Sequence, residues 1–285
     1  MDTRSFPALF LSHGSPMLAL EPGSTGPFLK RLGDALTASV GVPRAILAVS
    51  AHSLAREPVL LAGAQHAAVH DFGGFPEALY RLRYDAPGAP ALAEQVQQAL
   101  ADAGWPVHRV DEGGLDHGIW TMLRFMFPEA GIPVLPLAWV PTLPPSQQFA
   151  LGEALAPLRA QGVLVMGTGS ITHNLGRLFG ARRPATDAPE APDSAAFRQW
   201  MQQRSTACDW DALLAYRQQA PHAHEMHPTD EHLLPWFVAA GAGGRETAPR
   251  RLHEAVTYGS LGMDAYAFGP EAPSLERALG KALAA

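Results

Sequence analysis

The 285-residue chain is 47% hydrophobic and 17% charged, an ordinary composition for a globular protein that can bury a sizeable core. Its net charge of -6 leaves no basic excess to neutralise phosphates, so neither nucleic acid nor an anionic membrane is expected as a partner. The single Cys208 excludes an intrachain disulfide and a cysteine-rich zinc site. With no run near the ~20 apolar residues that span a membrane, this cysteine usage favours a cytoplasmic location.

Four short apolar runs predict buried strands, each ending in small or turn-forming residues. In chain order they are residues 7–11, 45–51, 133–140 and 163–169. Continuous apolar runs of this length are typical of strands that are covered on both faces of a sheet.

Helical patterns lie between and after these strands. They cover residues 28–39, 89–104, 146–162, 193–219 (as two helices) and 229–244, the last with Thr229 as a cap-like first residue. Residues 179–193 are expected to form a surface loop, and residues 253–269 a final strand and turn. Because strands and helices alternate, we predict an α/β fold: a single domain over residues 1–285, with a central, mainly parallel or mixed sheet flanked by helices.

Three histidines follow predicted strands. His13 follows the first strand, His52 follows the second, and His173 lies four residues beyond Gly169. In open α/β sheets, ligand sites gather outside the carboxyl ends of the strands. A single histidine at a strand end is as often a hydrogen-bonded structural residue as a functional one. Three histidines that converge at one edge of the sheet favour a functional cleft.

A fourth histidine, His232, lies beside apolar residues near the start of the predicted helix 229–244. Adjacent side chains diverge by about 100° around a helix, so only one of Glu231 and His232 can comfortably face a metal. Glu231 would suit the first turn as a solvated carboxylate, and this favours His232 as the ligand.

His117 is flanked by glycines in "GGLDHGIW", which would let the backbone approach a ligand closely. It is expected either to contact a substrate or to be a loop histidine bonded to Asp116 or to the backbone. Several imidazoles without cysteines suit Zn, Fe(II), Cu or Ni. Because they come from distant parts of the chain, they indicate a functional cleft and not a structural zinc site.

Two further segments deserve separate interpretation. In the loop "HDFGGFP", Phe72 and Phe75 could wall an aromatic substrate or could tuck the loop into the core. The segment "PHAHEMHP" (221–228) contains three histidines, but no strand positions them, and we do not expect a metal site there. Of the three, His227 is the one expected to border the pocket.

Seven motifs occur in one order along the chain: "PALFLSHGSPM", "VSAHS", "HDFGGFPEALY", "GLDHGIW", "GTGSITHNL", "HPTDEHLLP" and "YGSLGM". Together they closely resemble the class III extradiol ring-cleavage dioxygenases, in particular the DOPA 4,5-dioxygenase-like branch. The resemblance runs from about residue 7 to residue 263.

The resemblance implies one non-haem divalent metal held by three histidines, with two more histidines beside it. The implied ligands are His13, His52 and His232; His173 would be the acid/base or a fourth ligand, and His117 would line the substrate pocket. Fe2+ is implied for activity, although an all-histidine site also tolerates Zn2+, whereas well-known members of the wider class use two histidines and a glutamate. The implied substrates are O2 and a small aromatic diol, such as a DOPA-like catechol.

Three alternatives stay open on the sequence. A strand followed by "HGS" is also similar to the start of tetrapyrrole metal chelatases, although these do not account for "HDFGGFP" or "PTDEHLLP". Zinc on three histidines could activate water in a hydrolase, whereas "GTGSITH" does not match the nucleophile elbow of serine hydrolases. The chain could also be a non-catalytic metal-binding member of the superfamily. No feature of the sequence indicates the oligomeric state.

Overall fold

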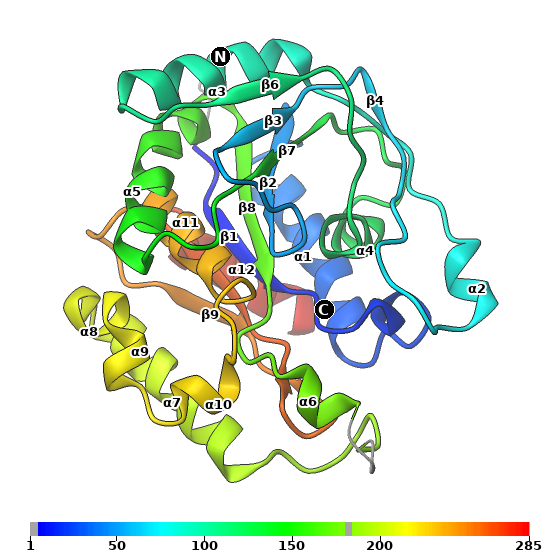
Figure 1. The fold of residues 1–285 in the computed structure, drawn as a ribbon, viewed down its shortest axis with the longest axis vertical. Helices are drawn as coiled ribbons and strands as arrows, with labels where there is room; N and C mark the ends of the chain where they lie inside the picture. The colour runs from blue at the N-terminus through cyan, green and yellow to red at the C-terminus, as the bar shows by residue number, and fades with distance from the viewer. Residues whose placement is uncertain (1–4, 180–183, 285) are drawn as a thin grey trace.

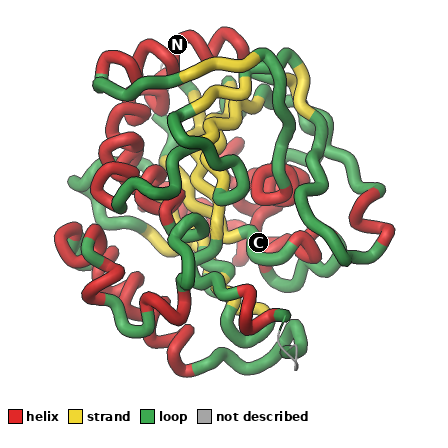
Figure 2. The backbone as a smooth tube through the Cα atoms, in the orientation of Figure 1, coloured by secondary structure: helices red, strands yellow, loops and turns green. Residues whose placement is uncertain are grey.

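The computed structural model describes residues 5–179 and 184–284, and its central feature is an eight-stranded mixed sheet (Figures 1 and 2). The strand order is β6-β3-β7-β2-β8-β1-β12-β9. The four central strands run parallel to one another: β7 (Val134–Ala138), β2 (Ala45–Ser50), β8 (Val163–Gly169) and β1 (Ala8–Ser12). These are the four strands that the apolar runs predict, and the expected α/β fold with a mixed sheet is confirmed.

The outer strands introduce the antiparallel pairings. On one side, β3 (Val59–Leu61) pairs antiparallel with β7 and parallel with the edge strand β6 (His108–Val110). On the other side, β12 (Ala265–Phe268) pairs antiparallel with β1 and with the edge strand β9 (Arg250–His253). Two small antiparallel sheets pair β4 (Gln65–His66) with β5 (Ala86–Pro87) and β10 (Val256–Thr257) with β11 (Leu261–Gly262).

Helices cover both faces of the sheet. One face carries α1 (Thr25–Ser39), α4 (His117–Met126) and α12 (Ala272–Ala284); the other carries α3 (Pro90–Asp102), α5 (Pro145–Leu155) and α11 (Leu234–Gly243). Along β8, Val163 and Val165 belong to the core under α5 and α11, whereas Leu164 and Met166 belong to the core under α1 and α4. This two-residue alternation between two buried faces explains why the strand is apolar throughout.

A further group of helices lies below the sheet in the view of Figure 1. It contains α6 (Leu175–Leu178), α7 (Pro192–Thr206), α8 (Trp210–Leu214), α9 (Tyr216–Gln219) and α10 (Ala223–Met226). The prediction of two helices over 193–219 is wrong, because three are present. Cys208 has φ +53, which ends the first helix, and the Asp209 carboxylate caps the next by accepting from the Ala212 N–H at 3.3 Å.

The predicted helix 229–244 is also wrong at its start, since α11 begins only at Leu234. The preceding residues form a turn in which the Leu233 N–H donates to the Asp230 carbonyl, and the His232 carbonyl accepts from the Ser170 N–H. His232 is therefore fixed by the chain that leaves β8, and not by a helix.

Other elements depart from the predicted boundaries in smaller ways. The predicted helix 146–162 is α5 followed by a 3-10 helix (Ala156–Gln161), and the predicted final strand is the set β9 to β12. Two further short helices are a 3-10 helix (Pro16–Ala19) and α2 (Glu77–Tyr80). In the expected loop 179–193, residues 184–191 contain no helix or strand, and 180–183 lie outside the described residues. No helix within the described ranges is long and apolar enough to cross a membrane.

Candidate metal centre

Five histidines meet at the carboxyl edge of the central strands. His13, His173 and His52 follow β1, β8 and β2, which are three consecutive strands of the sheet with β8 in the middle. His232 arrives from the turn before α11, and its imidazole stacks on that of His173 with ring centroids 3.4 Å apart and planes 8° apart. His117, the first residue of α4, lies with its ring centroid 4.0 Å from that of His52. The structure thus brings together all five histidines that the sequence singles out, although His117 begins a helix and is not in the expected loop.

The orientation of His13 is set by β8. The Thr168 hydroxyl donates to the Gly118 carbonyl at 2.9 Å, so its oxygen must accept from the His13 Nδ1–H, also at 2.9 Å. The Nε2 of His13 is then unprotonated, and it faces His52 Nε2 at 3.0 Å. Gly118 allows this approach, because a Cβ there would lie 2.9 Å from His13 Nδ1. Gly14, with φ +59, turns the chain away from the cluster just after His13.

His52 and His117 share one carboxylate, that of Asp71. The His117 Nδ1–H donates to Asp71 at 3.1 Å and the His117 backbone N–H donates at 2.9 Å, while His52 Nδ1 lies 3.5 Å from Oδ2. Burial raises the pKa of Asp71, but the hydrogen bonds and charge of His117 outweigh it and lower the pKa to about 2. An ionised Asp71 holds the His117 proton on Nδ1 and leaves the His117 Nε2 unprotonated, whereas the longer contact with His52 does not fix the tautomer of that ring. The sequence analysis did not find Asp71; its signal was an acidic residue next to His70 in the glycine-rich loop.

Glu231 has the same relationship to His232. Its Oε1 accepts from the His232 Nδ1–H at 3.1 Å and from the Thr229 hydroxyl at 3.0 Å. The expectation of a solvated Glu231 in a first helical turn is wrong, because the segment is a turn and the side chain is only 23% exposed. The two neighbouring side chains act together: Glu231 holds the Nδ1 proton and frees the Nε2 of His232.

All the clustered histidines with a resolved pKa shift are neutral near pH 7. Burial, helped by neighbouring imidazoles, lowers the pKa of His13 and His232 well below the usual value. Burial is also the main cause that lowers the pKa of His52 to about 4 and that of His173 to about 2. Neutral imidazole is the form that binds metals.

These residues fit a nitrogen-ligated divalent metal. The Nε2 atoms of His13 and His52 lie 3.0 Å apart, and without a metal the free Nε2 of His13 can accept from an Nε2–H of His52. A metal ion that both Nε2 atoms ligate would replace that shared proton. Ligand atoms of His13, His52 and His232 all lie within 4.8 Å of one another, as a shared ion requires.

A cavity of about 250 Å3 opens onto this cluster. Four histidines and Asp71 form most of the polar part of its wall, and apolar side chains form much of the rest. The lining residues are Gly14, Ser15, Pro16, His52, Asp71, Phe72, Gly73, Phe75, His117, His173, Leu175, Leu178, Phe179 and His232. Phe72 and Phe75 line the cavity and also pack against the hydrophobic core, so both placements left open for them are present. His227 does not line it: this buried residue donates from Nε2 to the Ile171 carbonyl at 3.0 Å and packs against Phe197.

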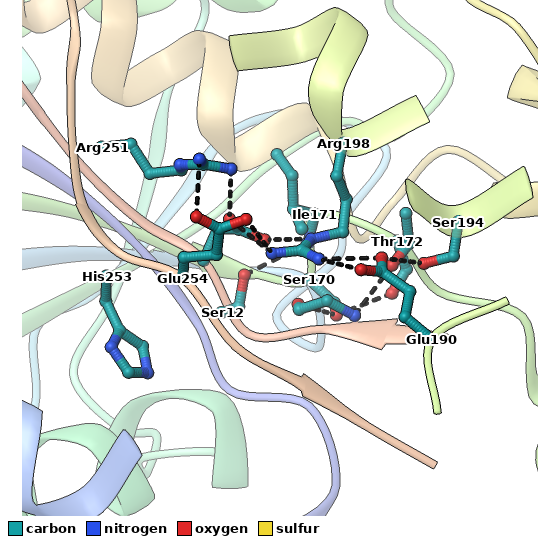
Figure 3. A network of polar contacts seen from close by, with 12 residues as sticks. Ser12, Ser170, Ile171, Thr172, Glu190, Ser194, Arg198, Arg251, His253 and Glu254 are labelled. Atoms are coloured by element: carbon teal, nitrogen blue, oxygen red, sulfur yellow. Dashed lines mark hydrogen bonds and ion pairs between the residues drawn. The ribbon is translucent and has the colours of Figure 1, made fainter. Parts of the chain in front are cut away.

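The loop that carries His173 is anchored by a buried polar network (Figure 3). Arg198 of α7 donates to both carboxylate oxygens of Asp264, at 2.7 and 3.0 Å. The Asp264 backbone carbonyl accepts from the Ser12 N–H, and the Ser12 hydroxyl oxygen accepts from the Ile171 N–H at 3.1 Å. The network thus joins α7 to Ser12, which immediately precedes His13, and to Ile171, which lies two residues before His173.

Comparisons with known proteins agree with this site. The family model described as the catalytic LigB subunit of aromatic ring-opening dioxygenase matches residues 7–269. Two relatives named 4,5-DOPA dioxygenase extradiol are similar over most of both chains: one from Beta vulgaris is 36% identical, covering 91% of this chain and 95% of its own, and one from Escherichia coli K12 is 34% identical, covering 92% and 94%. A crystal structure of an uncharacterized protein from Escherichia coli K12 superposes with a TM-score of 0.75 at 29% identity, over 93% of this chain and all of that one.

The chain therefore belongs to the class III extradiol dioxygenases, in the branch of the DOPA 4,5-dioxygenases. It is an extradiol dioxygenase, an oxidoreductase. Of the functions that the sequence left open, this membership supports the ring-opening dioxygenase over the chelatase and the hydrolase.

Proposed function

We propose that this dioxygenase uses one non-haem divalent metal, Fe2+, to open the ring of a small catechol with O2. The observation that supports it most is the pair of facing Nε2 atoms on His13 and His52, with His232 supplying a third nitrogen within reach. His13, His52 and His232 would hold the metal, which leaves coordination positions for the substrates. Bound there, Fe2+ would supply the redox chemistry by which O2 reacts with a catechol. Zn2+ also fits three imidazoles.

His117 is the first of two groups that would move substrate protons. Its Nδ1–H is held by ionised Asp71, so Nε2 is the atom that can accept a proton from a catechol hydroxyl. The imidazolium that results would be stabilised by the Asp71 carboxylate. This gives the cavity a positioned base without a solvent-exposed residue, since the His117 side chain is only 6% exposed.

His173 is the second such group, or alternatively a fourth ligand. It is buried, lines the cavity and stacks on His232, so a ligand in the cavity would lie within its reach. Its neutral imidazole would exchange a proton with the substrate oxygen as the ring opens. Because the proposed ligands come from β1, β2 and the turn before α11, the whole chain would act as one catalytic domain.

The experiment is an oxygen-uptake assay on anaerobically purified protein reloaded with Fe(II). With a catechol such as 3,4-dihydroxyphenylalanine or a 4-alkylcatechol, we expect one O2 consumed per catechol, no need for an added reductant, and a yellow ring-opened product. The reductant is unnecessary because both oxygen atoms enter the product and the aromatic ring supplies the electrons. Absence of O2 uptake across a broad catechol panel, with Fe(II) loading verified by metal analysis, would contradict the proposal.

A further inference from the structure

Thr168 is the last residue but one of β8 and belongs to the motif "GTGSITHNL", of which the proposed function uses only His173. Its side chain is fully buried, and its backbone already pairs with the two neighbouring strands, β1 and β2. The hydroxyl is not needed for that pairing. It lies instead 2.9 Å from two groups of other segments, the Nδ1 of His13 and the carbonyl oxygen of Gly118 in α4.

The chemistry of these two partners decides the direction of both hydrogen bonds. The Gly118 carbonyl can only accept, so the single proton of the Thr168 hydroxyl is donated to it. The hydroxyl oxygen can then only accept from His13, whose ring proton must lie on Nδ1. A neutral imidazole has one ring proton. The Nε2 of His13, which faces His52, therefore keeps its lone pair free for a metal.

His13 differs from the other two proposed ligands in its partner. Carboxylates face the Nδ1 atoms of His52 and His232 and can hold a ring proton there. Among the described residues, the partner of the His13 Nδ1 is an uncharged hydroxyl, and bulk water does not reach this fully buried ring. An N–H that is buried without an acceptor is costly. Without the hydroxyl, the proton of His13 would therefore favour Nε2, where it can be donated to His52 and would oppose a metal.

We infer that Thr168 is a positioning residue of the metal centre, whose hydroxyl selects the His13 tautomer that presents Nε2 to the metal. The inference rests on the proposed function, which makes His13 a ligand. The cavity wall formed by the described residues does not include Thr168, so this residue acts on the metal through His13 and not on the substrate directly. Its loss should weaken metal binding and should change the KM for a catechol little once the metal is bound.

The test removes the hydroxyl without changing the shape of the side chain. In Thr168→Val, we expect the affinity for Zn2+, measured by competition with a chromophoric chelator in the absence of substrate and O2, to fall roughly 10- to 100-fold. Thr168→Ser keeps the hydroxyl and should restore most of that affinity. Thr25→Val is the matched control, because Thr25 is also buried and its hydroxyl contacts a histidine ring outside the cluster, that of His253, at 3.1 Å. Its affinity should equal that of the unmodified protein.

The order of the two Thr168 variants separates a positioning role from a packing role. A packing role predicts that Thr168→Ser binds Zn2+ more weakly than Thr168→Val, because valine keeps the volume of threonine and serine loses a methyl group. That order would overturn the inference, as would a Thr168→Val protein that binds Zn2+ as tightly as the unmodified one. Kinetics at saturating Fe(II) give a second readout: a KM for catechol that rises as much as the metal Kd would show that Thr168 acts on the substrate.

These outcomes are distinguishable from a failure of the proposed function. If the Fe(II)-loaded enzyme turns over no catechol, the proposed function fails, and the Zn2+ competition still shows whether Thr168 supports a metal site. If the unmodified protein binds neither Zn2+ nor Fe2+, both the proposed function and the role of Thr168 are contradicted.

Discussion

The Nε2 atoms of His13 and His52 face one another at 3.0 Å, although the two residues follow strands that are not neighbours in the sheet. β8 lies between β1 and β2, and its Thr168 fixes the proton of His13 on Nδ1, while Asp71 faces Nδ1 of His52. The two Nε2 atoms can share one proton in the metal-free protein, and a metal ion that both atoms ligate would take the place of that proton.

We therefore expect His13→Ala and His52→Ala each to lose the metal. With one of three nitrogen ligands gone, affinity should fall by more than the roughly 10- to 100-fold typical of losing an outer partner. Metal content after dialysis against a weak chelator, read by elemental analysis, measures this. His108→Ala is the control, since His108 is an exposed histidine paired with Glu57 far from the cluster, and it should retain full occupancy. Full occupancy in either cluster variant would contradict the assignment.

The pair Glu231 and His232 gives a second, sharper comparison. His232→Ala should empty the site, whereas Glu231→Gln should keep the metal with affinity reduced by roughly 10- to 100-fold, because only the hydrogen bond to Nδ1 is weakened. Direct competition with a chromophoric chelator gives both affinities. The reverse result, with metal kept by His232→Ala and lost from Glu231→Gln, would make the carboxylate the ligand.

Asp71→Asn tests the carboxylate that His52 and His117 share. The amide keeps the shape but removes the negative charge, so a proton on His117 is no longer stabilised and His52 loses the ionic contact that orients it. We expect kcat to fall by roughly 100-fold, within the range general-base catalysis contributes, with KM changed much less. Asp85→Asn, at an exposed ion pair with Arg83, should leave both parameters unchanged. Equal kinetics in the two variants would remove Asp71 from the mechanism.

The sequence predicted the centre of the fold well because burial on both faces makes each central strand apolar throughout. The strands β3 and β6 were missed because they have three residues each and β6 contains His108 and Arg109, which break the apolar pattern. The helix α4 was missed because Gly118 was interpreted as part of a loop. The helix contains a glycine at this position because His13, from a distant part of the chain, approaches too closely to leave room for a Cβ.

The histidines of the site could be predicted, since strand ends mark where ligands gather, but their partners could not. Asp71 lies 46 positions from His117, and only the fold brings them together. The pairing of Glu231 with His232 was hidden by the assumption of a helix, in which neighbouring side chains would diverge. The start of α11 is decided by the contact of the His232 carbonyl with Ser170, which no local pattern records.

A pH dependence of stability follows from His227, which is buried and outside the histidine cluster. Burial lowers its pKa from 6.5 to about 4. Between these values the unfolded chain binds a proton that the folded protein does not, so the free energy of unfolding falls as pH falls, by about 2 kcal/mol between pH 7 and pH 5 for one such histidine. His227→Gln keeps a donor for the Ile171 carbonyl. Its free energy of unfolding should therefore fall less between pH 7 and pH 5, by the amount that His227 contributes. Urea unfolding of the metal-free proteins at both pH values measures it; identical declines would contradict the assignment.

Arg198 should matter for stability far more than its neighbours on α7. It is 3% exposed, and its guanidinium is bonded to both oxygens of Asp264, which is fully buried. Arg198→Met leaves that carboxylate with only Arg251, at 3.4 Å, and should cost about 3–5 kcal/mol of unfolding free energy. Arg204→Met, on the same helix but at a half-exposed pair with Asp209, should cost no more than about 1 kcal/mol.

The double variant Arg198→Met with Asp264→Leu distinguishes a buried unpaired charge from a general loss of packing. If the carboxylate without its partner is what destabilises the single variant, removing it as well should restore most of the lost free energy, because apolar replacements of buried ion pairs are often neutral. Urea denaturation at pH 7 gives all four values of the cycle. If the double variant is no more stable than Arg198→Met, the packing of the Arg198 side chain, and not its charge, holds α7 to the sheet. The charge of Arg198 would then contribute little to the stability of the network around Ser12 and Ile171.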